Sequence, residues 1–93
     1  MNFTEMDIFL IALKNYRENK IIQHNEKAKI FIWYVENIHK KGATIETTYP
    51  FLKAEFRSWV KGSDLNDKEI KNTERKVLEY LNMAKNRMDK ARG

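Results

Sequence analysis

Apolar side chains recur every three or four residues along most of the chain, which is the spacing of one face of an α-helix. Four segments carry this pattern, at about residues 5–19, 26–41, 50–61 and 67–90, and Gly or Asn lies between or beside them. The pattern therefore predicts an all-α fold. We expect a compact four-helix domain over residues 1–93, orthogonal or bundle-like, with the last helix the longest.

The second segment is the one whose secondary structure is ambiguous. Residues 29–35 are rich in β-branched and aromatic side chains, which also suits a strand. The apolar spacing continues to Ile38, and the segment ends in Lys40, Lys41 and Gly42, a basic last turn followed by a glycine stop. Length and ending together favour a helix, with Asn25 as its N-cap.

Short polar motifs mark the other helix ends. Thr4 with Asp7, and Asn66 with Glu69, have the spacing of N-terminal caps. Pro50 is expected in the first turn of the third helix, with Ala43–Thr48 as a loop before it. The apolar face of that helix is predicted to consist of Leu52, Phe56, Trp59 and Val60.

The first two helices carry more apolar surface than one core face needs. Residues 8–13 are apolar all round, so this helix needs cover on more than one side, from the fold or from a second copy of the chain. In the second helix we read the core stripe as Ala28, Phe31, Ile32, Val35 and Ile38, which leaves Trp33 and Tyr34 outside it. The candidate protein interface, or homodimer seam, is thus Ile8, Ile11, Trp33 and Tyr34. The alternative is that the fold buries these helices on two sides.

Composition narrows the class of protein. The chain has 93 residues, no Cys and a net charge of +5. Without thiols it has no disulfides and no thiolate zinc site, and it suits the cytoplasm. Its longest apolar runs, residues 8–13 and 30–35, are too short to span a membrane, and the acidic start is unlike a signal peptide. We expect a small, basic protein without membrane contact.

The residues that could support catalysis or hold a metal are few and scattered. His24 and His39 are the only histidines, and neither has a second ligand at helical spacing. Ser58 and Ser63 have no neighbouring His, and three isolated glycines form no phosphate-binding loop. We therefore expect a non-enzyme with no catalytic residues, no metal and no cofactor.

Two groups of cations are candidate nucleic-acid contacts. Lys53, Arg57 and Lys61 follow one another at four-residue steps along one side of the third helix. Near the C-terminus the candidates are Lys85, Arg87 and Lys90. The alternative is an ordinary solvated helix face in the first case, and charge that complements the helix dipole in the second.

The order of a helix ending at Gly42, a short helix with Leu52 and Trp59, and a long helix over Lys71–Leu81 resembles the helical core-binding domain of tyrosine recombinases, over about residues 26–82. The sequence holds no catalytic domain, so the resemblance implies at most DNA binding. Size and composition also resemble small accessory proteins of phages and mobile elements. We therefore expect a basic accessory or regulatory protein that binds nucleic acid, DNA rather than RNA. The alternative is a helical protein-binding module, such as an inhibitor, adaptor or assembly factor.

Overall fold

A computed structural model describes residues 4–18 and 24–91, and these residues form helices and turns without a strand. The helices are α1 (Glu5–Glu18), α2 (His24–Tyr34), which continues into the π-helix η1 (Val35–His39), α3 (Ile45–Val60) and α4 (Asp67–Ala91). The expected all-α, four-helix fold with the longest helix last is confirmed. The ambiguous residues 29–35 are helical.

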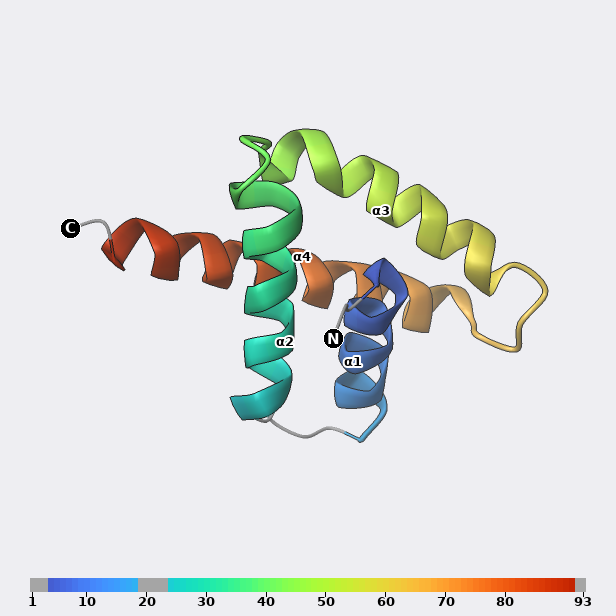
Figure 1. Cartoon of the computed structure of the whole chain (residues 1–93). Helices are drawn as coiled ribbons and strands as arrows, with labels where there is room; N and C mark the ends of the chain where they lie inside the picture. The colour runs from blue at the N-terminus through green and yellow to red at the C-terminus, as the bar shows by residue number, and fades with distance from the viewer. Residues whose placement is uncertain (1–3, 19–23, 92–93) are drawn as a thin grey trace.

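Helix α4 is the element on which the other three pack. Its 25 residues correspond to about 37 Å, most of the 43 Å long dimension of the molecule. Helices α1 and α2 lie side by side and both cross α4 steeply, whereas α3 runs along α4, which folds back after the turn at residues 61–66 (Figure 1). The C-terminal end of α4 projects beyond α2.

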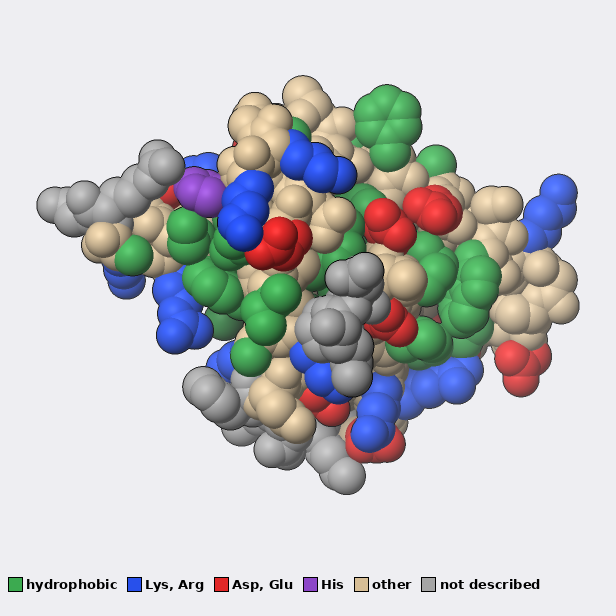
Figure 2. Space-filling model, in the orientation of Figure 1, with side chains coloured by type: hydrophobic (Ala, Val, Ile, Leu, Met, Phe, Trp, Pro, Cys, Tyr) green, Lys and Arg blue, Asp and Glu red, His purple; other side chains and the backbone are tan. Residues whose placement is uncertain are grey.

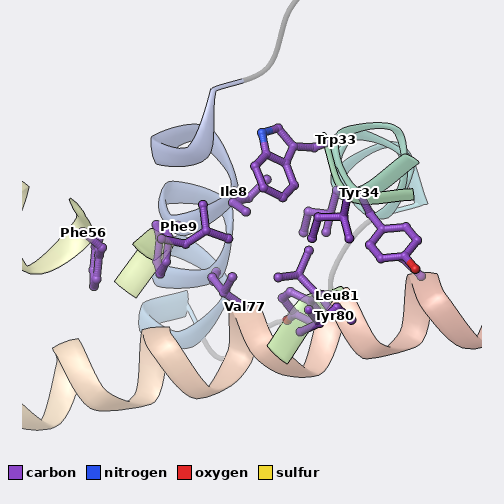
Figure 3. Packing of buried hydrophobic residues seen from close by; sticks show 14 of the residues in the cluster. Ile8, Phe9, Trp33, Tyr34, Phe56, Val77, Tyr80 and Leu81 are labelled. Atoms are coloured by element: carbon purple, nitrogen blue, oxygen red, sulfur yellow. The ribbon is translucent and has the colours of Figure 1, made fainter. Parts of the chain in front are cut away.

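The buried side chains of all four helices form one cluster. At one end the rings of Phe9 and Phe56 stack, with centroids 4.3 Å apart and planes 7° apart. Val77 and Leu81 of α4 fill the space between α1 and α2 (Figure 3). Because α1 contacts α4, α2 and α3, the chain itself buries Ile8, Phe9, Ala12 and Leu13, whereas Leu10 in the same apolar run is exposed.

The buried face of α2 differs from the stripe read from the sequence. Ile30, Trp33, Tyr34 and Ile38 are buried, whereas Ile32, placed in the stripe, is 47% exposed. The other members of that stripe, Ala28, Phe31 and Val35, are partly buried. The run of apolar residues 30–35 places apolar side chains on every side of the helix, so periodicity alone does not show which face is buried. The structure places the large rings of Trp33 and Tyr34 inside, where they bury the most area.

A glycine ends this helix in the expected way. Gly42 has φ +67°, its N–H donates to the His39 carbonyl at 3.1 Å, and the Ala43 N–H donates to the Ile38 carbonyl at 3.0 Å. These two bonds form a Schellman motif, which satisfies carbonyls at the helix end. At the start the prediction was wrong, because α2 begins at His24 and so includes Asn25, which was expected to be the cap.

Helix α3 begins five residues before Pro50, so the expected loop at residues 43–48 is a further correction. Thr44 is the N-cap, and its hydroxyl accepts from the Thr47 N–H at 3.2 Å while the Thr44 N–H reaches the Thr47 hydroxyl. This capping box uses threonine in place of the usual Glu or Gln, which is why it was missed. Pro50 lies inside the helix, where it costs one hydrogen bond near the N-terminus.

The other two caps form as predicted. The Asp7 N–H donates to the Thr4 hydroxyl at 3.3 Å, and the Thr4 N–H to the Asp7 carboxylate at 2.7 Å. The Glu69 N–H donates to the Asn66 side-chain oxygen at 2.8 Å, with a return contact from the Asn66 N–H.

Candidate binding pocket between α2 and α4

The predicted basic row on α3 is interrupted by an ion pair. Arg57 donates from Nε and Nη2 to the two carboxylate oxygens of Glu74, at 2.6 and 2.8 Å. The Glu74 side chain is 7% exposed, so this bidentate pair is partly buried. Lys53 is exposed on α3, and Lys61, also exposed, lies just past the end of α3 as its C-cap with extended backbone, so it does not continue the predicted helical row. The middle cation of the row is thus already engaged in joining α3 to α4.

Sequence reasoning missed Glu74, although its spacing was a signal. It lies four residues after Ile70 and three before Val77, on the inward side of α4. Tyr49 of α3 supports the same region by donating its hydroxyl to the Glu74 carbonyl at 2.5 Å. Burial, and then the negative charge of Glu74, raise the pKa of Tyr49 to about 12.

The C-terminal cations also have separate surroundings. Lys85 pairs with Asp89 at 2.9 Å, and the guanidinium carbon of Arg87 lies 5.1 Å from the centre of the Phe31 ring, on α2. Lys90 is exposed. Over the face seen in Figure 2, basic and acidic side chains alternate and do not gather into one positive patch. The structure therefore does not bring the six predicted nucleic-acid residues together.

Arg87 and Phe31 belong to a pocket of about 210 Å³ between α2 and α4. The residues that line it are Lys27, Ile30 and Phe31 from α2, and Tyr80, Met83, Ala84 and Arg87 from α4. This site was not predicted, because its two walls come from helices whose crossing point cannot be read from local periodicity.

The bottom of the pocket belongs to the core and its edge to the surface. Ile30, Tyr80 and Ala84 are buried, whereas the Met83 side chain at the edge is 46% exposed. The Tyr80 hydroxyl donates to the Asn15 side-chain oxygen at 2.9 Å. Burial raises the pKa of Tyr80, so its hydroxyl stays protonated and keeps its hydrogen bond to Asn15. The ring of Tyr80 adds apolar surface to the pocket.

The predicted protein-interface residues serve another purpose. Ile8, Trp33 and Tyr34 are buried by the chain itself, which is the alternative that the sequence left open, and Ile11 is partly buried. Other large apolar side chains are exposed instead: Leu10, Ile32, Phe51, Trp59 and Met83. Trp59, expected in the core face of α3, is 52% exposed. Of these five residues, Met83 lines the pocket.

Within residues 4–18 and 24–91, no three His, Asp or Glu side chains come together as ligands. His39 ends η1, with its ring 6.4 Å from that of Tyr34. In the same part of the chain, no helix has the length and apolarity to cross a membrane.

Comparisons with known protein families, with curated protein sequences and with solved structures give no significant match.

Proposed function

We propose that this protein is a helical protein-binding module that holds an apolar side chain of its partner in the pocket between α2 and α4. The observation that supports this proposal is an open pocket with a buried apolar floor and a half-exposed methionine at its edge. Inhibitors, adaptors and assembly factors act through such contacts. The rows of cations favour the nucleic-acid alternative less, because Arg57 and Lys85 are already paired with carboxylates.

The size of the pocket suits one large side chain. An apolar protein cavity of about 150 Å³ is enough to hold benzene, and this pocket measures about 210 Å³. Burial of one Leu, Phe or Met side chain contributes about 1.5–3 kcal/mol. Met83 is flexible and polarisable, and such a side chain can adapt to anchors of different shape.

The lining favours an amino-acid side chain over a nucleotide base. A base carries polar groups along its edge, and burying them without partners is costly. Ile30, Met83 and Ala84 cannot hydrogen-bond such an edge through their side chains. The Tyr80 hydroxyl already donates a hydrogen bond to the Asn15 side-chain oxygen. An apolar anchor leaves nothing unsatisfied in this lining.

Selection of peptides from a random library on the immobilised full chain tests the proposal. We expect peptides with one large apolar residue, whose binding shifts the NMR signals of residues 27–31 and 80–87. Ala84→Leu would fill the pocket and weaken the binding of these peptides at least tenfold. Ala54→Leu, the same substitution at an exposed position of α3, is the matched control and would leave binding unchanged.

Two results would overturn the proposal. One is that the selected peptides shift signals away from the pocket, and the other is that Ala84→Leu, folded by circular dichroism, binds them as well as the parent chain does. If Ala84→Leu does not fold, Met83→Ser at the exposed edge replaces it, with the same expected loss.

A further inference from the structure

The charged residues of the pocket indicate which residues of a partner would lie next to the apolar side chain that enters it. Lys27 comes from α2 and Arg87 from α4, so the pocket has a cation on each of its two walls. Both are exposed. Among the residues that the structure describes, no acidic one is part of the lining. An occupant of the pocket would therefore meet positive charge at both walls.

These two cations differ from the surface cations that are held in ion pairs. Arg17, Lys40, Arg57, Lys71, Lys76 and Lys85 each lie within 4.0 Å of a carboxylate. In the part of the chain that the structure describes, neither Lys27 nor Arg87 has such an ion pair. Glu26 and Glu79 are close enough to raise the pKa of Tyr80, after burial, but they do not line the pocket. The cationic walls thus lack an acidic counterpart within the lining.

Arg87 is also prepared for a carboxylate by its contact with Phe31. The guanidinium lies over the ring at 5.1 Å, which holds the side chain beside the pocket by a cation–π contact of about 0.5–1 kcal/mol. A cation–π contact uses the charge of the guanidinium and leaves its N–H donors available for hydrogen bonds to oxygen. Those donors match the two oxygens of a carboxylate.

We propose that the partner segment is acidic: its apolar anchor enters the pocket, and carboxylates on either side of the anchor pair with Lys27 and Arg87. This inference rests on the proposed protein-binding function and specifies its partner. We take a protein segment as the occupant because the apolar part of the lining disfavours the polar edge of a base, and the charge of the walls then selects carboxylates.

Three labelled peptides with one central tryptophan, flanked by glutamates, glutamines or lysines, test the inference by fluorescence anisotropy. On the parent chain we expect the acidic peptide to bind at least tenfold more tightly than the glutamine peptide, and the lysine peptide to bind most weakly. The preference should shrink between about 50 and 200 mM salt, because exposed charges are screened.

Charge reversal supplies the control. The double variant Lys27→Glu/Arg87→Glu should prefer the lysine peptide, whereas Lys53→Glu/Lys61→Glu, with the same change in net charge away from the pocket, should keep the preference of the parent chain. Both pairs are exposed, so folding should persist. Arg87→Lys keeps the charge but loses the planar guanidinium, so it should weaken binding of the acidic peptide by a smaller factor than Lys27→Glu/Arg87→Glu does.

The two proposals fail in distinguishable ways. Equal binding of the glutamine and glutamate peptides, or an unchanged preference in Lys27→Glu/Arg87→Glu, overturns the acidic partner and leaves the pocket in place. A library that yields no peptide at the pocket overturns both. Single-stranded DNA that competes at the pocket, or a dimer that Lys27→Glu/Arg87→Glu dissociates, would identify a different occupant and also overturn the inference.

Discussion

Arg57 on α3 holds Glu74 on α4 through two parallel contacts, and Glu74 is the most buried carboxylate among the ion pairs of the described residues. The pair joins the last turn of α3 to α4, close to the turn that connects the two helices. A cation that the sequence predicts to contact a ligand thus helps to hold the fold together. Lys53, another cation one turn earlier on α3, is exposed.

Arg57→Glu should destabilise the protein by about 2–4 kcal/mol, because it leaves the buried Glu74 without its partner and adds a like charge. Lys53→Glu/Lys61→Glu should change the free energy of unfolding by about 0.5 kcal/mol or less. Urea denaturation measures both. Arg57→Met with Glu74→Leu should recover most of the loss, and equal stability of Arg57→Glu and the parent chain would contradict the structural role.

Tyr49 should make the protein sensitive to alkali. Its pKa is raised from 10.0 to about 12, so folding favours the neutral phenol. The stability it contributes is complete below about pH 10 and is lost as the pH rises towards 12. Tyr49→Phe should show a smaller fall in stability between about pH 10 and 12, measured by urea denaturation. An identical fall in both proteins would show that Tyr49 ionises as freely as in the unfolded chain.

The two tryptophans should respond differently to truncation. Trp33 is 3% exposed and belongs to the core cluster, so Trp33→Ala should cost about 3–5 kcal/mol, a large part of the stability of a domain this size. Trp59 is half exposed beside Phe56, so Trp59→Ala should lower the free energy of unfolding by only about 1 kcal/mol. Thermal unfolding followed by circular dichroism compares them. Equal losses would mean that the packing of α2 is not as described.

Most of the helix ends could be predicted from short sequence motifs. The caps at Thr4 and Asn66 and the stop at Gly42 act within a few residues, so each could be recognised without knowledge of its surroundings. The start of α3 was misplaced because Thr44 and Thr47 form a capping box in which threonine replaces an acidic residue. Pro50, the stronger signal, is tolerated inside the helix.

The parts that could not be predicted depend on how helices cross. The face that α2 buries is decided by where Trp33 and Tyr34 meet α1 and α4, since the segment is apolar on all sides. The pairing of Arg57 with Glu74 joins residues 17 positions apart on two helices. The pocket likewise needs Phe31 and Arg87 to meet across α2 and α4. None of these contacts follows from the period of one helix.

Binding to nucleic acid should be weak and should depend little on salt. Each phosphate contact adds about 0.9 to the slope of log affinity against log salt on duplex DNA. With Arg57 and Lys85 engaged by carboxylates, Lys53 and Lys61 are the exposed cations of the α3 row, so that row should give a slope of about 2 or less. Anisotropy with labelled duplex DNA at several salt concentrations measures it. A slope of about 5, abolished by Lys53→Glu/Lys61→Glu, would instead favour the nucleic-acid function, because it corresponds to about five or six phosphate contacts, more than the row supplies even if Arg57 leaves Glu74.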